Sequence, residues 1–526
     1  MGADLILVAQ TVRPFAKSRR ESTLTPFSDH RGAGPLAGIP LFFYNGCMTT
    51  TKMPKVTVHP NAVLGICCLS LLVVSMDATI VNVALPDIRR DLGASLAGLQ
   101  WVIDAYTIVL ASFLMLGGST ADRFGRRRVF QIGMALFTIG SLLCSLANSV
   151  QTLVAARVIQ ALGGSMMNPV AMSIIVHTFT DAKARARAIG IWAATSGLAL
   201  ALGPLTGGFL TQTLGWHAIF WINVPIGIVA LWLTARYIPE SRAPHPRRPD
   251  VVGQALLLMG LATLIFAVIE SDRGATVAGA SALLSALAFV ALVVYERRRH
   301  EPLLDVRFFR SLPFTSATVI AICMFAALGG FLFLNSLYLQ DVRGLSAFAA
   351  GLAILPTALT VTIVSPLSGR LVGNYGARPS LLVSGVMLTL SALALAQLHP
   401  QTPIVYVLVV YALFGIGFGM VNAPVTFAAV SGMPRAQAGL ASAVASTSRQ
   451  IGVSVGVALA GAVAGNRNEA RGITDFTAAT HRFWWILAAL GILIVVLGLL
   501  STGARGRAST ARIAHLLQEP DAGTAR

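Results

Sequence analysis

The chain has 526 residues, of which 55% are hydrophobic and only 11% are charged, and its formal net charge is +18. A soluble globular protein carries about a quarter charged residues, so this composition excludes water as the main solvent and favours an integral membrane protein. The positive charge does not indicate nucleic-acid binding, because the basic residues lie in short clusters between apolar runs instead of gathering in one domain.

Residues 1–60 are predicted to form a cytoplasmic tail. They contain several arginines, prolines and glycines, and they lack an apolar run long enough for a spanning helix or a signal peptide. A second interpretation is that synthesis starts at Met48 or Met53, because the membrane pattern begins soon afterwards. N-terminal sequencing of the native protein that finds Gly2 or Ala3 would exclude this second interpretation.

Fourteen apolar runs follow the tail, and each has about the 20 residues that a spanning helix needs. Of the 39 lysines and arginines, thirty lie in tails and loops on the side of the N-terminus, seven lie on the other side, and two lie inside spans. Because positively charged loops stay in the cytoplasm, both termini are expected on the cytoplasmic side of the inner membrane. The predicted spans are 61–84, 98–117, 129–147, 151–172, 188–211, 217–236, 251–270, 276–295, 313–338, 347–368, 380–397, 403–425, 438–463 and 483–501.

The loop after the second span is repeated, in weakened form, after the tenth. Segment 118–128 aligns with segment 369–378 at an offset of 251 residues, with coinciding glycines and with Arg127 opposite Arg378. Two related halves are typical of transporters. The repeat therefore predicts two six-helix bundles and an inserted helix pair. The predicted domains are an N-terminal bundle (61–236), the inserted pair (251–295), a C-terminal bundle (313–501) and a cytoplasmic C-terminal tail (502–526).

Several segments give the chain a resemblance to a known family. Segment 118–128 resembles the loop between helices 2 and 3 of the major facilitator superfamily, and the remaining segments resemble its fourteen-helix drug:proton antiporter branch. The resemblance covers about residues 60–500. It implies an all-α integral membrane protein with the major-facilitator fold. The remaining segments are 77–86, 157–164, 203–208, 216–227 and 446–452.

The loop 118–128 is predicted to act as a conformational latch. Its glycines permit a tight turn, and Asp122 can accept hydrogen bonds from guanidinium groups or from a helix N-terminus. By resemblance, the latch would hold the two halves together on the cytoplasmic side and break as the protein turns inward. The alternative is that its arginines only determine topology. The latch residues are Gly118, Asp122, Arg123, Gly125, Arg126 and Arg127.

Three ionisable residues, Asp77, Asp104 and Arg157, lie inside predicted spans, where such groups are costly and usually functional. Each lies six or seven residues from the outer end of its span, so all three are expected at a similar depth, about 9–11 Å below the outer boundary. A carboxylate there can exchange a proton as its water access and its distance from the arginine change. We expect Asp77 or Asp104 to carry the proton and Arg157 to tune it, with a permanent structural ion pair as the alternative.

Small residues in the fifth span form a second motif of the resembled family. Glycines let helices approach closely, and a proline loosens the helix, which suits a contact about which two bundles rock. By resemblance the motif marks exporters, although Ala199 occupies its usual first glycine position. Ordinary tight packing is the alternative. The motif residues are Gly203, Pro204, Gly207 and Gly208.

Arg449 lies near the middle of the thirteenth span without an obvious acid in its own half. It would either pair across the central cavity or meet an anionic group of the substrate. Together with Gln160 and Gln450, it makes up the expected lining of the substrate cavity.

The predicted function is proton-coupled efflux of an amphiphilic, often cationic compound by alternating access, with protons and the lipid bilayer as the other partners. No cofactor or metal is expected, because the chain has no Gly-x-x-x-x-Gly-Lys-Ser/Thr segment and its five cysteines lack metal or redox spacing. A monomer is compatible with this organisation. The alternatives are an exporter of an endogenous metabolite and, from another class, a membrane-embedded enzyme or receptor.

Overall fold

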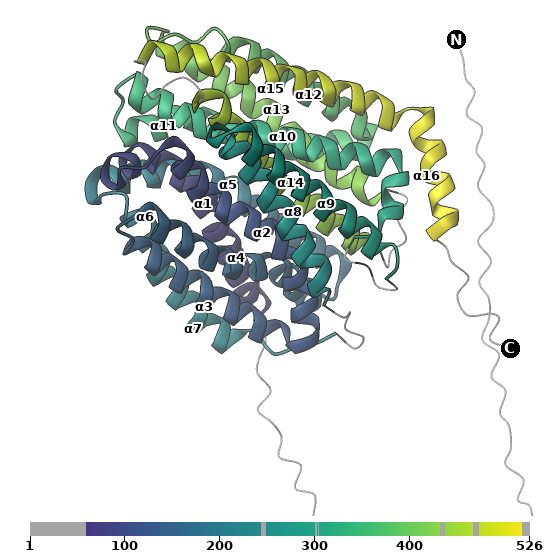
Figure 1. Cartoon of the computed structure of the whole chain (residues 1–526). Helices are drawn as coiled ribbons and strands as arrows, with labels where there is room; N and C mark the ends of the chain where they lie inside the picture. The colour runs from purple at the N-terminus through teal and green to yellow at the C-terminus, as the bar shows by residue number, and fades with distance from the viewer. Residues whose placement is uncertain are drawn as a thin grey trace, which may run out of the picture. The chain divides into compact units, whose positions relative to one another are not determined.

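The computed structural model describes residues 59–243, 249–299, 302, 304–431, 437–465 and 473–517. All regular elements in this part of the chain are helices, as the sequence predicts (Figure 1). A helix satisfies its own backbone hydrogen bonds, so it is the form that long apolar runs take in a bilayer. The predicted N-terminal tail, including both candidate start sites, lies outside the described residues except for its last two positions.

The first half of the chain forms a helical bundle, drawn in purple and blue in Figure 1. The predicted span 217–236 is divided between a short helix and a longer one, which are separated by Ile222 alone. The helices of this half are α1 (Pro60–Leu92), α2 (Leu96–Phe124), α3 (Arg126–Ser145), α4 (Val150–Thr178), α5 (Ala182–Leu214), α6 (Ala218–Trp221) and α7 (Asn223–Tyr237).

The second half forms a corresponding bundle, drawn in green and yellow beside the first half (Figure 1). A single π-helical turn, η3 (Tyr338–Val342), extends its first helix. The helices of this half are α10 (Leu312–Leu337), α11 (Ala347–Tyr375), α12 (Ala377–Leu395), α13 (Ile404–Val430), α14 (Ala438–Gly465) and α15 (Ile473–Thr502).

The internal repeat extends from the loop motif to the helix boundaries. Helix α2 runs from 96 to 124 and α11 from 347 to 375, so both ends differ by 251 positions; α3 begins at 126 and α12 at 377, again a difference of 251. The helices of the two halves are therefore related by the same offset of 251 residues as the glycines of the two loops.

Thirteen helical segments among the described residues are long and apolar enough to cross a membrane, and they match thirteen of the fourteen predicted spans. The remaining span corresponds to α14, which has 28 residues but is not among the thirteen. Arg449, Gln450 and several serines make it more polar than the others. Helix α14 packs against α10 in its own half and against α2 in the other, so this polar helix lies between neighbours within the bundle.

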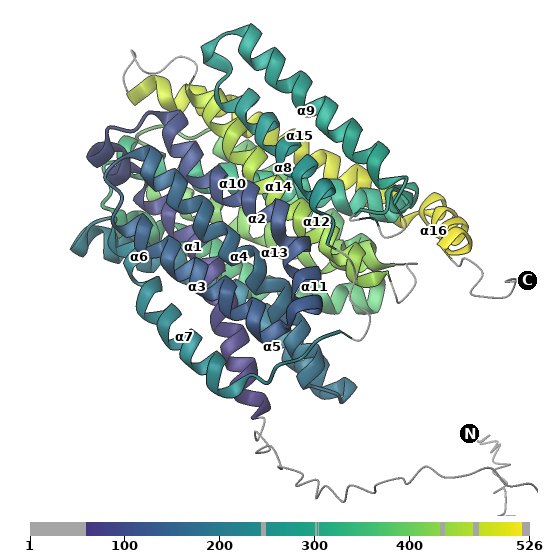
Figure 2. The same ribbon diagram turned by 60° about the horizontal axis from the view of Figure 1, so that its bottom comes forward.

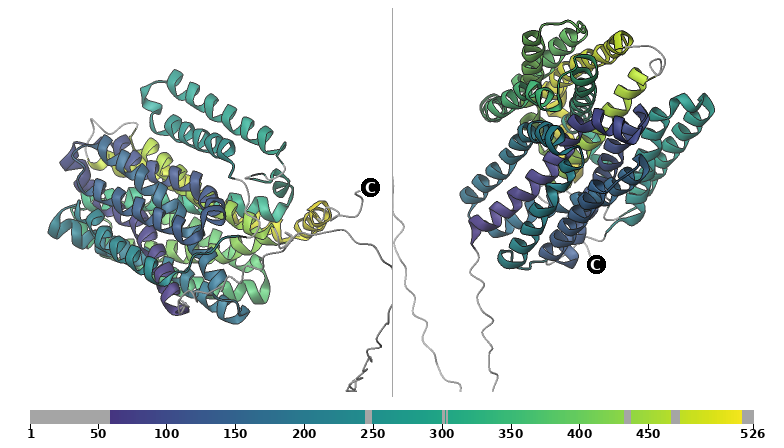
Figure 3. Two further views of the ribbon diagram at one scale, coloured as in Figure 1. Left: turned by 90° about the horizontal axis from the view of Figure 1, so that it is seen from below. Right: turned by 90° about the vertical axis from the view of Figure 1, so that its left-hand side faces the viewer.

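The inserted pair consists of α8 (Val251–Ile269) and α9 (Ala275–Glu296), which pack against each other on the outside of the bundle (Figures 2 and 3). Helix α8 contacts α2 of the first half and α14 of the second. Leucine and isoleucine side chains of α8 pack there with Ile108 and Ala458. The inserted pair therefore covers the line along which the two halves meet.

The predicted C-terminal tail contains a helix that the sequence analysis did not anticipate. Helix α16 (Ala504–Leu517) follows α15 after Gly503 and packs against the start of α10, where the Ser509 hydroxyl accepts a hydrogen bond from the Leu312 amide at 3.0 Å. Residues 518–526 lie outside the described part of the chain.

Candidate functional site

Asp77 on α1 and Arg157 on α4 form an ion pair in the interior of the first half. The Arg157 Nη1 atom lies 2.5 Å from the Asp77 Oδ2 atom, and both side chains are fully shielded from solvent. The Arg157 Nε–H also donates to the Val102 carbonyl of α2 at 3.2 Å, and the guanidinium lies over the Tyr106 ring, 3.9 Å from its centroid. The predicted proximity of the aspartate and the arginine is thus realised as a direct contact.

Three neutral polar side chains complete this network. The Asp77 Oδ1 atom accepts hydrogen bonds from the Gln160 amide at 2.7 Å and from the Asn223 amide at 3.1 Å. Both amides also donate to the Ser141 hydroxyl, at 2.7 and 3.3 Å. Both oxygens of Asp77 therefore have hydrogen-bond donors, so the carboxyl group is held in one orientation.

Sequence reasoning found only part of this network. It predicted that Gln160 lines a substrate cavity, whereas the structure places its side chain inside the first half, saturated by Asp77, Arg157 and Ser141. It did not identify Ser141 or Asn223 as members. Asn223 belongs to a segment that carried the family resemblance, so its presence in that motif was the available signal. An isolated serine in an apolar helix gives no such signal.

Asp104 on α2 lies apart from the Asp77–Arg157 pair in its interactions. It is fully buried, its Oδ1 atom accepts a long 3.5 Å hydrogen bond from Thr107, and its Oδ2 atom has no hydrogen-bond partner among the described residues. Ser454 of α14 lies beside the carboxyl group. Asp104 therefore occupies the contact between the two halves, and its environment differs from that of Asp77.

The loop 118–128 holds its charges within the first half. Arg126 reaches back over one helical turn, and its Nη2 atom lies 3.0 Å from the Asp122 Oδ1 atom. The Arg127 guanidinium donates to the Ala235 carbonyl at 2.8 Å. Gly125 has a φ of 112°, a backbone conformation that favours glycine. The sharp turn that the glycines predict is present.

Glu240, which follows α7, is a partner of this loop that sequence reasoning missed. Its carboxylate accepts hydrogen bonds from the backbone amides of Arg127 at 3.1 Å and Arg128 at 3.3 Å, in the first turn of α3. A side chain at Gly125 would collide with it, since an added Cβ would lie 2.6 Å from the Glu240 Oε1 atom. An acid at a helix N-terminus satisfies free amides and the helix dipole, so Glu240 fixes the loop to its own bundle.

The glycine motif of α5 is divided between two contacts. A Cβ at Gly203 would lie 2.0 Å from the Thr79 hydroxyl of α1, and one at Gly207 would meet Ile80. A Cβ at Gly208 would instead lie 2.4 Å from the Ala347 carbonyl of α11, in the other half. The motif thus serves both packing within one half and close approach of the two halves.

The two halves also meet through polar contacts at one end of the bundle, the end that carries the α1–α2 loop (93–95), called the closed end from here on. The Gln100 amide on α2 donates to the Val457 and Ala458 carbonyls of α14 at 3.0 and 2.9 Å. The Ser336 hydroxyl on α10 donates to the Asn82 carbonyl of α1 at 2.5 Å. These contacts and the approach of α5 to α11 join the halves at the closed end.

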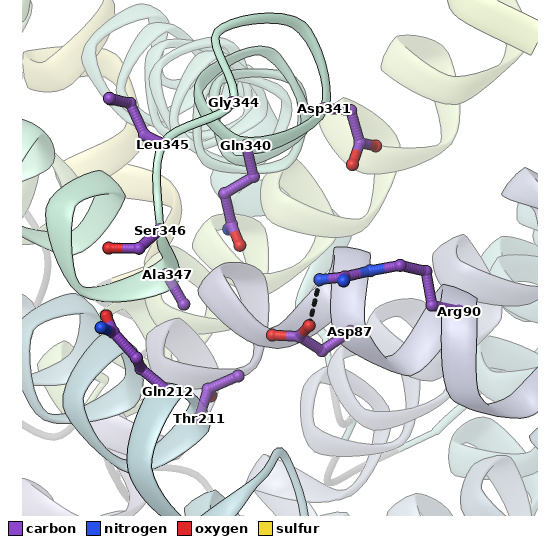
Figure 4. A pocket seen from close by; sticks show the side chains of 10 residues that line it. All are labelled: Asp87, Arg90, Thr211, Gln212, Gln340, Asp341, Gly344, Leu345, Ser346 and Ala347. Carbon is purple, nitrogen blue, oxygen red and sulfur yellow. Dashed lines mark hydrogen bonds and ion pairs between the residues drawn. The ribbon is translucent and has the colours of Figure 1, made fainter.

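A polar pocket of about 580 Å³ lies at the closed end and is lined by residues of both halves. Figure 4 shows Gln340 pointing into it from η3, with Asp87 and Arg90 of α1 paired on the opposite side. The Gln340 amide also donates to the Val83 carbonyl at 2.8 Å. The pocket therefore requires both halves to be together at this end.

Arg449 and Gln450 are both partly buried on α14. Arg449 Nη2 donates to the Thr426 hydroxyl of α13 at 2.7 Å, and its guanidinium lies 5.9 Å from the ring centroid of Phe325 on α10. The structure brings no predicted site residue of the first half to Arg449 by a hydrogen bond or an ion pair within the described residues.

Comparison with known proteins places these features in a family. The model of the Major Facilitator Superfamily matches residues 67–457. The chain is 39% identical over 398 residues to the multidrug resistance protein Stp of Mycobacterium tuberculosis, covering 75% of this chain and 74% of that protein. It is 35% identical over 405 residues to the tetracenomycin C resistance and export protein of Streptomyces glaucescens, covering 76% and 74%.

A solved structure supports the fold. The D-xylose–proton symporter superposes with a TM-score of 0.61 at 15% identity, over 84% of this chain and 97% of that one. Together with the apolar helices and the paired halves, these matches identify the chain as a multi-pass membrane protein and a secondary transporter, not an enzyme. The chain belongs to the major facilitator superfamily.

Proposed function

We propose that this chain exports amphiphilic drugs or other toxic small molecules across the cytoplasmic membrane in exchange for protons. The named functions of its relatives, multidrug resistance and antibiotic export, support efflux as the direction of transport. The distribution of lysines and arginines supports cytoplasmic termini. Two bundles, 61–236 and 313–501, would rock about the contacts between them, with the pair 251–295 as an accessory.

The observation that carries the proposal is the environment of Asp104. A buried ionised carboxylate with an oxygen that lacks a donor costs more than a neutral carboxyl group in the same place. Asp104 has an oxygen without a partner among the described residues, and it lies where α2 of one half meets α14 of the other. When the halves separate along this line at the closed end, water reaches the group and it can take up a proton. Asp104 is therefore our proton carrier.

Asp77 has a different role in this proposal. Three donors surround its carboxyl group, and one of them is the guanidinium of Arg157, which stays charged at physiological pH. The pair orders α1, α4 and α7 around a fixed centre, and it supplies the rigidity that alternating access requires of each bundle. This assigns the permanent ion pair to Asp77 and the titrating group to Asp104.

The conformation in the structure fits a protein that is open toward the cytoplasm. With the N-terminus inside, α1 runs outward, and the closed end faces the exterior. The latch loop on the opposite end contacts Ala235 and Glu240 of its own half. A latch that has released the second half agrees with the inward-facing state, in which the solute would enter.

The proposal is tested with purified protein in proteoliposomes that contain a pH-sensitive dye. With the outside acidified, we expect an amphiphilic cation such as ethidium to be moved and protons to flow in the opposite direction, both dependent on the imposed pH difference. Empty liposomes are the control. Solute movement that is the same with and without the pH difference would contradict proton coupling. In that case we also expect that the chain gives no drug resistance to a host that lacks its own pumps.

A further inference from the structure

Arg449 is a cation in the interior of the second half, in contact with residues of two neighbouring helices. It lies near the middle of α14, with Thr426 of α13 accepting its hydrogen bond and Phe325 of α10 under its guanidinium. Its Nε atom is buried without a hydrogen-bond partner among the described residues. The guanidinium therefore still has donor capacity to offer, because it carries five N–H groups in a fixed fork.

Arg449 also lacks a counter-charge. The ion pairs of the described residues do not include it, whereas Arg157, the other arginine inside a predicted span, is paired with Asp77. A cation within the membrane is costly, and such residues usually pair or mark a pathway for a solute. Within the described residues, one of these two arginines is neutralised by an acid and the other is not.

The position of Arg449 makes it reachable from the region between the halves. Its side chain is only partly buried, and Thr426 beside it is exposed. Helix α14 contacts α2 of the first half, and α10 contacts α1. Two of the three helices around Arg449, α14 and α10, thus face the first half.

Aromatic rings lie next to the guanidinium. The Phe325 ring centroid is 5.1 Å from that of Phe418, and the two rings meet edge to face at 64°. Rings of this kind offer apolar surface to a flat solute. A cation with free donors beside such surface is complementary to an aromatic compound that carries a negative group.

We propose that Arg449 is the anion-binding subsite of the substrate site, and that the chain exports aromatic compounds bearing a carboxylate, sulfonate or phenolate group. This inference deepens the proposed efflux function and rests on it. Arg449 would bind the anionic group with its free donors, and Phe325 would contact the ring system. Thr426 holds the guanidinium in place. The substrate class then includes organic anions in addition to amphiphilic cations.

The test measures binding of two xanthene dyes, anionic fluorescein and cationic rhodamine 6G, to the full chain in lipid nanodiscs by fluorescence anisotropy. We expect Arg449→Gln to weaken fluorescein binding about tenfold, the effect of losing one charge-assisted contact. Rhodamine 6G binding should strengthen, because a repelling charge is removed. The readout is the ratio of the two dissociation constants, which an indirect structural effect on both dyes would leave unchanged.

Two further variants keep the test decisive. Arg449→Lys retains the charge but loses the planar fork, so fluorescein binding should fall less than in Arg449→Gln. Arg343→Gln removes the same charge at the η3–α11 loop, and it should leave the ratio as it is. The inference is overturned if the unaltered protein does not bind fluorescein, if Arg449→Gln weakens both dyes equally, or if it changes neither.

Binding is measured without a gradient, so the result does not depend on proton coupling. A chain that binds fluorescein through Arg449 but moves no dye in response to a pH difference in proteoliposomes would contradict the proposed function and leave the subsite intact. A chain that exports rhodamine 6G with a pH difference but shows no Arg449-dependent binding of fluorescein would contradict the subsite and leave the proposed function intact.

Discussion

The two halves have corresponding helices, but the interior of the first half is charged where that of the second is aromatic and aliphatic. In the first half, Asp77, Arg157 and Gln160 form a fully buried charged network. At the positions 251 residues later, the second half has Leu328, Leu408 and Tyr411. Tyr411 packs there against Phe331, with ring centroids 4.9 Å apart, and donates a hydrogen bond to Asn335 at 2.6 Å.

This difference indicates a division of roles between the halves. A charged centre with all its partners in place specifies one arrangement of its helices, whereas an aromatic and aliphatic centre packs without ion pairs. Arg449, a cation near the middle of α14 in the second half, has no such partners among the described residues. The first half therefore contains the ion chemistry, and the second half presents apolar surface and an unneutralised cation to a solute.

The largest expected effect comes from breaking the charged centre. Asp77→Leu introduces the residue found at the corresponding position of the second half, Leu328, and leaves Arg157 buried without its acid. The free energy of unfolding should fall by about 3–5 kcal/mol. The double variant Asp77→Leu/Arg157→Leu copies the second half at both positions and should recover most of that loss, because an apolar replacement of a buried pair is often neutral. Thermal unfolding in detergent measures both effects.

The double variant separates stability from transport. We expect it to fold and to lose efflux, since the first half would then lack its fixed polar centre. If the double variant unfolds at as low a temperature as Asp77→Leu alone, the framework of this half depends on the charges themselves, and the comparison with the second half fails.

The second prediction concerns Asp104, whose counterpart in the second half is Leu355. Asp104→Asn should reduce efflux driven by a pH difference at least about tenfold, because an amide cannot carry the proton. Exchange of labelled solute across proteoliposomes without a gradient should continue. Stability should change little, since no ion pair is lost. If Asp104→Asn keeps the original rate of proton-coupled transport, the proton carrier must be another group.

The fold of each half was predictable, but much of the interior network was not. The apolar runs, the charge distribution and the glycines at an offset of 251 residues sufficed for the helices and for the two halves. Equal depth predicted that an aspartate lies near Arg157, but it did not distinguish Asp77, which forms the pair, from Asp104, which does not. Ser141 and Glu240 were missed, because a serine in an apolar helix and an acid after a helix have the same local sequence whether or not a distant helix presents donors to them.

The same reasoning misplaced Gln160. Gln160 was expected to line the substrate cavity, but a residue's position along a helix does not fix the direction of its side chain. The rotation of α4 against α1 and α3 turns Gln160 inward, where Ser141 and Asp77 satisfy its amide. Such rotations arise from the packing of all neighbouring helices, which one helix's sequence does not contain.

The third prediction addresses the loops that the two halves have in common. The loop of the first half is fixed by Glu240, which binds the amides at the start of α3. Glu240→Gln keeps the size of the side chain but removes its charge, and it should destabilise the loop by about 1 kcal/mol. Hydrogen exchange of the Arg127 and Arg128 amides measures this effect. Exchange rates equal to those of the unaltered protein would show that the carboxylate does not hold the loop.

The smallest effect is expected at the closed end, where the halves differ at another pair of positions. Pro86 on α1 has no N–H, so it cannot donate to the Asn82 carbonyl four residues earlier. The Ser336 hydroxyl of the other half donates to this carbonyl instead. The counterpart of Pro86 is Leu337, which leaves no carbonyl free in α10. The proline thus creates an acceptor for the opposite half.

Ser336→Ala should therefore weaken the closed end by about 1 kcal/mol, the usual worth of one hydrogen bond. Labelling of Thr211→Cys, a buried position in the pocket of Figure 4, by an impermeant maleimide reports opening of this end and should become several times faster. In a Pro86→Ala background the helix can satisfy the Asn82 carbonyl itself, so Ser336→Ala should then have little further effect. Equal acceleration in both backgrounds would mean that Ser336 holds the closed end by packing and not through the carbonyl that Pro86 leaves free.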